Sequence, residues 1–299
     1  MSLVSSLPSA RRVVRRHAQR HAQWLKYEIL WARLLWRAAV KGIPARSLGR
    51  VHTFLRSHYD KGLFPHVHPL QNPRTSYFPG LRACAVYDPR EIAWTALLER
   101  AYPEIRSELL SMIGRNKLSP HPQGLTDTGS WQVKYFHLQG EAQEEAHQLC
   151  PNTSAVLKSC LPMGPSHQVF CSVLGANSHI APHCGPVNTR LTCHLGLVVP
   201  PGPTLRVGSE MATWQEGKCL VFDDSFEHEA WNQTDSERAV LLIQFWHPDL
   251  TEAEVWALKE LRPFTTSSEY KQAAMRGGAV RRKKRSVLSP VDPSPSPNL

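Results

Sequence analysis

The 299-residue sequence lacks an apolar run long enough to cross a lipid bilayer. Its best candidate, residues 24–40, contains four charged side chains, and burying each at a bilayer centre costs roughly 3 kcal/mol, more than the apolar residues return. No secretory signal pattern is evident either. We therefore expect a cytoplasmic or peripherally membrane-associated protein. The first 27 residues are rich in Arg and Ser and contain no acid, which leaves a mitochondrial location open.

Cysteine is scarce: there are seven residues, and none forms a CxxC pair with zinc-binding spacing. So few scattered thiols exclude a small disulfide scaffold and favour buried free thiols. Cys150 and Cys160 bracket a polar loop, which makes them candidates for a disulfide in an oxidising compartment. The sequons at Asn152 and Asn232 would matter only in a secreted chain.

Acidic residues are few at both ends of the chain. Residues 1–60 hold twelve Lys/Arg against two Asp/Glu, and residues 271–299 hold seven against one, whereas residues 61–270 hold 16 against 22. Clustered Lys/Arg attract anionic surfaces, so the basic ends are either solvated arms or contacts for an anionic membrane. No specific nucleic-acid binding is predicted, and the oligomeric state is not indicated.

Helical spacing dominates the first part of the chain. The apolar residues within 24–40 predict a basic amphipathic helix that either packs on the domain or lies on a membrane surface. Prolines between residues 60 and 88 predict an extended strap. A second helical stretch is expected over residues 90–113. Its predicted core side consists of Ile92, Leu97, Tyr102, Ile105, Leu109 and Leu110.

The periodicity changes from about residue 129. Residues 131–138 alternate as a strand does, and further strand-like runs occupy 168–173, 190–199 and 239–246, with a polar loop expected over 140–165. Short strands without intervening helices predict an antiparallel barrel or jelly roll. A helix over 251–260 closes the domain, with Thr251 as N-cap and Glu254 in the capping-box position.

These patterns predict an α+β protein with a mainly β core and four parts. They are a basic helical N-terminal extension (1–60), a proline-rich strap with its supporting helix (61–128), a β domain (129–265) and a disordered basic Ser/Pro tail (270–299). The tail includes the basic run 281–285, whose default interpretation is a solvated segment.

Two histidine-bearing segments point to chemistry. His183 leads a tight turn that feeds the strand at 190–197, whose alternation places Arg190, Thr192 and His194 on one face. His228 follows a second strand-like run. Ten residues later, Arg238 opens an apolar strand, where its charge would be buried unless an anion meets it. The pattern therefore predicts a polar cavity with a dicarboxylate ligand.

The stretch from residue 172 to 250 contains the motifs PHCGPVNTRLTCHLGL, FDDSFEHEAW and FWHPDL and resembles the aspartyl/asparaginyl β-hydroxylase domain family. Weaker similarity reaches back to residues 129–131, so the resemblance covers about half of the chain. It implies a double-stranded β-helix, a jelly-roll or cupin-like barrel, with helices packed N-terminally. It also implies an enzyme that uses Fe(II), 2-oxoglutarate and O2 to hydroxylate a protein or peptide side chain, with decarboxylation of 2-oxoglutarate to succinate. By this resemblance, the endoplasmic reticulum is a further candidate compartment.

The resemblance also implies roles for individual residues. His183 and His228 match the metal ligands, which makes them the expected catalytic residues. Four further residues match the 2-oxoglutarate pocket: Ser172 and Arg238 at the distal carboxylate, His194 toward the metal, and Trp131 as a wall.

The usual carboxylate ligand two residues after the first histidine is replaced by Gly185, so only two protein ligands are implied. Asp223 or Asp224 is then the expected acceptor that holds a water or the His228 ring.

Two positions depart from the family pattern. Phe170 and Thr192 stand where basic residues are expected to grip a substrate carboxylate. Arg190 and Thr192 remain as the candidate substrate contacts. Two alternatives therefore stay open beside a protein or peptide hydroxylase: a non-catalytic binding module on the same barrel, and an oxygenase directed at a lipid or another small molecule.

Overall fold

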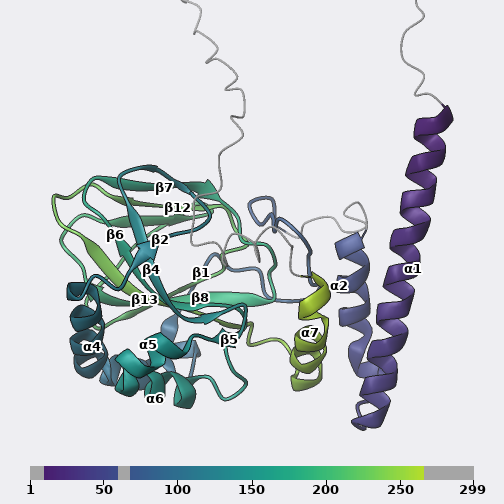
Figure 1. The fold of residues 1–299 in the computed structure, drawn as a ribbon, viewed down its shortest axis with the longest axis horizontal. Helices are drawn as coiled ribbons and strands as arrows, with labels where there is room; N and C mark the ends of the chain where they lie inside the picture. The colour runs from purple at the N-terminus through teal and green to yellow at the C-terminus, as the bar shows by residue number, and fades with distance from the viewer. Residues whose placement is uncertain (1–9, 60–67, 266–299) are drawn as a thin grey trace, which may run out of the picture.

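The computed structural model describes residues 10–59 and 68–265 and contains two antiparallel sheets flanked by helices (Figure 1). The larger sheet has the strand order β1-β11-β8-β13-β6-β4-β2, with β5 beside β4. Its strands are β1 (Val86–Tyr87), β2 (Ser119–Pro120), β4 (Trp131–Leu138), β5 (Glu141–Ala142), β6 (Val169–Leu174), β8 (Arg190–Val198), β11 (Cys219–Phe222) and β13 (Arg238–Trp246). The α+β class with a mainly β core is confirmed.

The smaller sheet has the order β10-β9-β12-β7-β3. Its strands are β3 (Thr126–Thr128), β7 (Ser178–His183), β9 (Thr204–Val207), β10 (Glu210–Thr213) and β12 (His228–Asn232). The two sheets pack through one apolar cluster, to which β6 and β13 contribute Leu174 and Val240, and β7 and β9 contribute Ile180 and Leu205. This packing leaves a cavity between the facing sheets, lined by both polar and apolar side chains.

The strands predicted from alternation agree with the structure to within one or two residues. β4 spans the predicted residues 131–138, while β6, β8 and β13 lie within one residue of their predicted bounds at each end. On β8, Leu191, Cys193 and Leu195 enter the main core, and the opposite face lines the cavity. The strands β7, β9 and β12 were not predicted.

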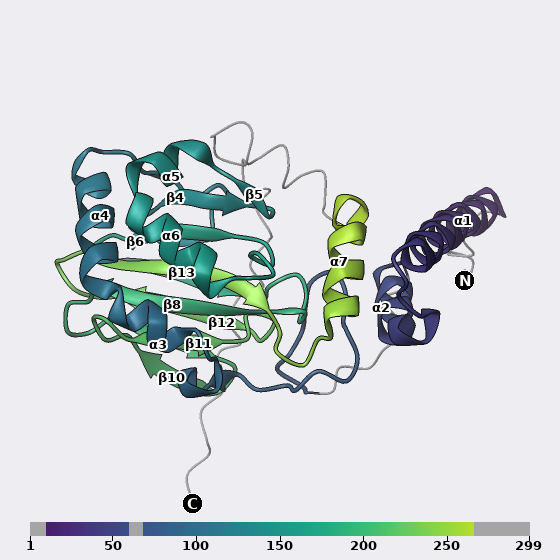
Figure 2. The same cartoon turned by 90° about the horizontal axis from the view of Figure 1, so that it is seen from below.

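Four helices cover the outer face of the larger sheet (Figures 1 and 2). They are α3 (Thr95–Arg100), α4 (Tyr102–Gly114), α5 (Glu144–Leu149) and α6 (Pro151–Cys160). The helical stretch predicted over residues 90–113 is confirmed, but it is divided: it starts with the short 3-10 helix η2 (Pro89–Glu91), and its α-helix breaks at Ala101, before Pro103. Of its predicted core residues, Ile92, Ile105 and Leu109 are buried, while Leu97, Tyr102 and Leu110 are only partly buried.

The prediction of a polar loop over residues 140–165 was wrong, since this segment contains α5 and α6. Cys150 and Cys160 lie at opposite ends of α6, and both are buried free thiols. Ten residues of helix separate their Cα atoms by about 15 Å, well beyond the reach of a disulfide. The disulfide that the sequence left open between them is therefore excluded.

A second helical layer stands at one end of the sheets. Both views show α7 (Glu252–Thr265) beside the sheets, then α2 (Gly49–Tyr59), then α1 (Ala10–Val40) outermost (Figures 1 and 2). The short 3-10 helix η1 (Ala45–Leu48) joins α1 to α2. Tyr27 and Leu34 of α1 share an apolar cluster with Phe54 of α2 and Leu258 of α7.

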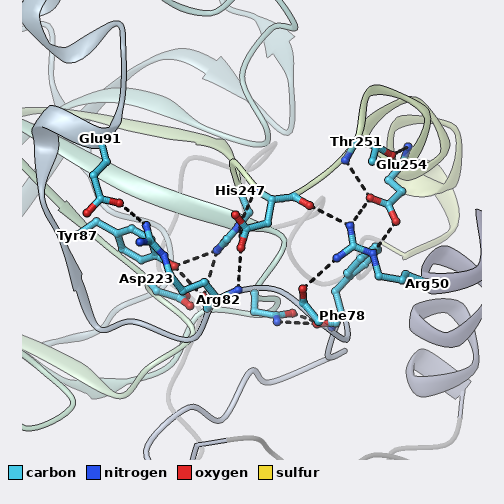
Figure 3. A network of polar contacts seen from close by, with 12 residues as sticks. Arg50, Phe78, Arg82, Tyr87, Glu91, Asp223, His247, Thr251 and Glu254 are labelled. Carbon is cyan, nitrogen blue, oxygen red and sulfur yellow. Dashed lines mark hydrogen bonds and ion pairs between the residues drawn. The ribbon is translucent and has the colours of Figure 1, made fainter. Parts of the chain in front are cut away.

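Arg50 ties this layer together (Figure 3). Its guanidinium donates to both carboxylate oxygens of Glu254, at 2.8 and 2.6 Å, and to the carbonyls of Gly80 and Asp249. Glu254 also accepts from the Thr251 backbone N–H at 2.9 Å, while its own N–H donates to the Thr251 hydroxyl at 3.3 Å. The predicted capping box is thus confirmed, and it holds one partner of the ion pair.

Several predictions fall partly or wholly outside the described residues. The Ser/Pro tail with its basic run lies there, as do residues 60–67 of the strap. The described remainder of the strap contains no helix before η2. No described helix is long and apolar enough to span a membrane.

Candidate active site

The two histidines predicted as metal ligands lie side by side. His183 ends β7, His228 begins β12, and the two residues are direct partners across the antiparallel pair. Their ring centroids are 4.1 Å apart, with the ring planes at 53°. Two imidazoles from segments far apart in the sequence therefore lie next to each other in the cavity.

Backbone hydrogen bonds fix the orientation of both rings. Nδ1 of His183 lies 2.8 Å from the Ala181 carbonyl oxygen, and Nδ1 of His228 lies 2.9 Å from that of Phe226. A carbonyl only accepts, so each Nδ1 carries the hydrogen and each Nε2 keeps its lone pair. Neither Nε2 has a hydrogen-bond partner within residues 10–59 and 68–265, which suits both atoms to metal ligation.

Burial keeps both rings neutral. It lowers the pKa of His183 to about 3 and that of His228 to about 4. The neighbouring His228 contributes to the lowering at His183, while the hydrogen bonds to the backbone carbonyls oppose it. Neutral imidazoles are the form that binds a cation, so the pair is ready to ligate at neutral pH.

Arg238 is buried without an acidic partner. It is 2% exposed, and its Nε and Nη1 atoms have no hydrogen-bond partner in the described part of the chain. The guanidinium lies 4.4 Å above the Trp214 ring, and burial lowers its pKa to about 9. A buried cation without a counter-ion is costly, so the residue indicates an anionic ligand in this cavity.

Two neighbours of Arg238 are oriented as donors to the same ligand. Trp214 Nε1 donates to Nδ1 of His194 at 3.0 Å, which leaves the ring hydrogen on His194 Nε2, a buried atom without a partner among the described residues. Trp131 Nε1 donates to the Ser172 hydroxyl oxygen at 2.9 Å and frees that hydroxyl to donate elsewhere. These predicted pocket residues all line the same cavity.

An acidic side chain borders the histidine pair on another side. Asp224 is 6% exposed; its Oδ2 accepts from Gln244 at 2.9 Å and lies 3.8 Å from Arg190 Nε. Its Oδ1 is buried and has no partner within the described ranges. A Cβ on Gly185 would lie 2.4 Å from that oxygen, so the glycine permits the approach of Asp224 to the turn after His183.

Asp223 does not face the cavity, because both of its carboxylate oxygens have other partners. Its Oδ2 accepts from Gln71 at 2.9 Å, and its Oδ1 accepts from the Ser225 N–H at 2.9 Å. The His228 ring is held by a carbonyl and not by either aspartate. Of the two predicted acceptors, Asp224 alone lines the cavity.

The cavity has a volume of about 320 Å³ and includes every predicted site residue in its lining. Phe222 forms the wall between its two ends: its ring is edge-on to His194 at 5.1 Å and tilted against His228 at 5.6 Å. Arg190 and Thr192 line it from β8, and Arg190 Nε lies 3.8 Å from Asp224 Oδ2.

Residues absent from the sequence-based prediction also contribute. Arg74 from the strap, His121 from the turn before β3, and Gln244 from β13 all line the cavity. The His121 ring stacks on Trp131 with centroids 3.6 Å apart, and burial lowers its pKa to about 3. The alternation of β13 gave a signal for Gln244, the one polar side chain between Arg238 and Trp246. The sequence around Arg74 and His121 offered none.

The fold and site define a class: an antiparallel two-sheet protein whose cavity offers two neutral imidazoles and an arginine that has no acidic partner in the described part of the chain. A model of the family described as aspartyl/asparaginyl beta-hydroxylase matches residues 99–248. The chain belongs to this family of hydroxylases.

Named relatives and one solved structure give the range of similarity. The mouse aspartyl/asparaginyl beta-hydroxylase is 38% identical over 180 residues, which cover 58% of this chain and 24% of that protein. The ornithine lipid ester-linked acyl 2-hydroxylase of Rhizobium tropici is 39% identical over 193 residues, or 60% of this chain and 67% of that protein. A 2OG-Fe(II) oxygenase-family structure from Burkholderia pseudomallei has 13% identity and a TM-score of 0.36, covering 57% of this chain and 96% of that one. The chain thus spans about a quarter of the length of the mouse relative.

Proposed function

We propose that this protein is an Fe(II)- and 2-oxoglutarate-dependent dioxygenase that hydroxylates a C–H bond, and that its two sheets form a double-stranded β-helix. One observation carries the proposal: the cavity that holds the two available imidazole nitrogens also holds a buried guanidinium without a counter-ion. A metal chelated by a ligand with a remote carboxylate satisfies both features at once.

His183 and His228 would hold the iron through their Nε2 atoms. The described residues include no cluster of three His, Cys, Asp or Glu side chains suited to a metal, so further positions would be left for the cosubstrate, O2 and water. When bound, Fe(II) with 2-oxoglutarate supplies the oxidising chemistry, with decarboxylation to succinate.

The chain's own part is to orient the cosubstrate. Arg238 pairs with its distal carboxylate, assisted by the Ser172 hydroxyl that Trp131 holds in place. The hydrogen on His194 Nε2 is donated to an oxygen nearer the metal end. Because all these donors are fixed by neighbours, little reorganisation is needed on binding.

Asp224 would accept a hydrogen bond from a water at the open metal position through its unpartnered Oδ1. Burial raises the pKa of this carboxyl, and the Arg190 charge opposes that rise. Arg190 and Gln244 thereby keep the carboxylate in place beside the site.

For the substrate, we propose a protein or peptide side chain that reaches the metal past Arg190 and Thr192. Thr192 Oγ1 is buried and has no partner among the described residues, so it is available to a polar substrate group. The mouse relative's name, aspartyl/asparaginyl beta-hydroxylase, supports this class.

A lipid acyl chain is the second candidate, favoured by the apolar part of the cavity. Phe170 occupies a position where the family pattern has a basic residue. With Leu242 it forms an apolar cluster beside Trp131. Phe54 and Leu258 extend the apolar lining at the helical layer. The Rhizobium relative is named for acyl-chain hydroxylation. Supplying either peptide libraries or phospholipids to the enzyme separates the two.

The test is succinate formation from 2-oxoglutarate, dependent on Fe(II) and O2, with cell lysate as substrate source. His183→Ala and His228→Ala should each abolish it, and substrates should lose their +16 Da shift in mass spectra. The control is His179→Ala, because His179 lies on the same strand as His183 but bonds Asp127 and Glu229 outside the cavity. Retained turnover in either ligand variant would refute the assignment.

Anaerobic titration separates an enzyme from a binding module. The proposal requires that the wild-type chain binds Fe(II) and then 2-oxoglutarate. A chain that binds neither would be the non-catalytic module considered above.

A further inference from the structure

We infer that the outer face of α1 is a docking surface for an anionic lipid bilayer. The surface, here called the outer stripe, consists of Leu25, Ile29, Trp36 and Val40. This inference is independent of the proposed chemistry, since it concerns a helix that contributes no residue to the cavity lining.

The outer stripe is apolar, contiguous and exposed. Its four residues are 60, 59, 68 and 73% exposed in chain order. At 3.6 residues per turn they fall within a sector of about 60°, over a length of about 22 Å. Exposed apolar residues usually occur singly, so an aligned row of four marks an interaction surface.

The inner face of α1 is already occupied, which shows that packing on the domain does not use the stripe. Tyr27, Leu34 and Ala38 are 1 to 2% exposed and pack against α2 and α7. Around the helix they lie opposite the outer stripe. The helix is therefore apolar on two faces, of which the fold of the described residues covers one.

Charge selects the occupant. The α1 sequence holds eight Lys/Arg and a single acid, Glu28. Lys26 and Arg33 are exposed and lie along one flank of the stripe. Basic side chains beside apolar ones on an interfacial helix are the combination that anionic membranes bind.

The same charge disfavours other occupants. A second copy would bring another strongly basic helix against the first, and the chain's own C-terminal segment, with seven Lys/Arg against one acid in residues 271–299, would repel it likewise. An anionic bilayer complements both the apolar and the basic parts.

Docking at α1 would bring the cavity's helical wall near the bilayer. Beneath α1 lie α2 and α7, which contribute Phe54, Leu258 and Arg262 to the cavity lining (Figure 2). Membrane contact would then hold the apolar end of the cavity one helical layer from the lipid.

The test is co-sedimentation of the full chain with vesicles of phosphatidylcholine alone or mixed with phosphatidylserine. We expect binding to the mixed vesicles at low salt, weakened by high salt. Ile29→Glu with Trp36→Glu should reduce the partition coefficient about tenfold or more. The control is Met211→Glu on β10, because Met211 is 62% exposed and apolar but lies outside the stripe. Thermal unfolding followed by circular dichroism verifies that both variants fold.

Three outcomes would overturn the inference. They are a wild-type chain that stays in the supernatant at low salt, equal binding of the double variant and the wild type, and equal binding to neutral and anionic vesicles. A wild-type dimer in light scattering that dissociates in the double variant would assign the stripe to a second copy instead. None of these results depends on whether succinate is formed.

Discussion

At the scale of single residues, Gly185 leaves the proposed metal site with two protein ligands. It stands two residues after His183, where many non-haem iron sites place a carboxylate. A Cβ there would lie 2.4 Å from Asp224 Oδ1 and 2.9 Å from the Asp224 carbonyl oxygen. Glycine at this position therefore provides no third ligand from the His183 turn, and it allows the segment that carries Asp224 to approach that turn.

We predict that Gly185→Ala lowers the free energy of unfolding by about 1–3 kcal/mol, because the Asp224 backbone must shift. Gly185→Asp should bind Fe(II) more weakly than the wild type instead of gaining a ligand. Urea unfolding and anaerobic iron titration measure these effects. Tighter iron binding in the aspartate variant would show that the turn can accommodate a third ligand.

Arg238 is the residue whose removal should separate cosubstrate binding from chemistry. Because the proposal pairs its guanidinium with the remote carboxylate, Arg238→Ala should raise the KM for 2-oxoglutarate roughly 10–100-fold while kcat at saturation falls much less. Arg238→Lys should recover part of the affinity, since the charge remains but the forked geometry does not. The exposed Arg115→Ala is the matched control. An unchanged KM in Arg238→Ala would remove the cosubstrate from this pocket.

At the scale of elements, α5 and α6 are helices that the sequence did not predict. Their buried residues are Ala146, Cys150, Thr153, Leu157 and Cys160, at alternating spacings of four and three. That spacing is a helical signal, but the polar residues between them made the segment resemble a loop. The buried face is short and mixed in polarity; α5 packs on β4, and α6 packs on α3 and α4.

The link between α2 and α7 is an element-scale prediction. We expect Glu254→Ala to lower the free energy of unfolding by about 2–3 kcal/mol, since the carboxylate is 4% exposed and serves both Arg50 and the α7 N-terminus. Arg50→Ala should cost a similar amount, because it leaves the buried Glu254 carboxylate without its cation. The two effects should not add.

The coupling between Arg50 and Glu254 is measured by a double-mutant cycle. The exposed ion pair between Arg82 and Glu91, also drawn in Figure 3, is the control for that cycle. Both side chains are nearly half exposed, so a cycle on this pair should couple by less than about 1 kcal/mol. Equal coupling in the two cycles would show that burial of Glu254 does not matter.

At the scale of the whole molecule, the cavity concentrates buried neutral histidines. Burial lowers the pKa of His183, His228 and His121, to between about 3 and 4, and of His194 and His167 well below 6.5. In the unfolded chain these rings bind protons near pH 6.5. Acid therefore favours unfolding of the metal-free protein.

We predict that its stability is greatest above about pH 6.5 and declines as the pH falls toward 4, by up to about 1.4 kcal/mol per pH unit for each ring. Asp223 opposes this decline: burial raises its pKa to about 7, so the folded state gains from its protonation over the same range. Urea unfolding of the metal-free chain between these pH values measures the slope. Asp223→Asn should steepen the decline, and a stability that rises on acidification would contradict the prediction.

The sequence by itself determined the strands whose side chains alternate, the capping box at Thr251, and the candidate ligands, because each depends on residues close together in the chain. Only the tertiary structure decided that His183 and His228 are cross-strand partners, that the strap supplies Arg74, and that Gly185 admits Asp224. Such pairings follow from the register between strands remote in sequence, which is set by the packing of the whole sheet. The outer stripe of α1 likewise became visible only when the opposite face was seen to be buried, since a helical pattern alone does not say which apolar face the fold covers.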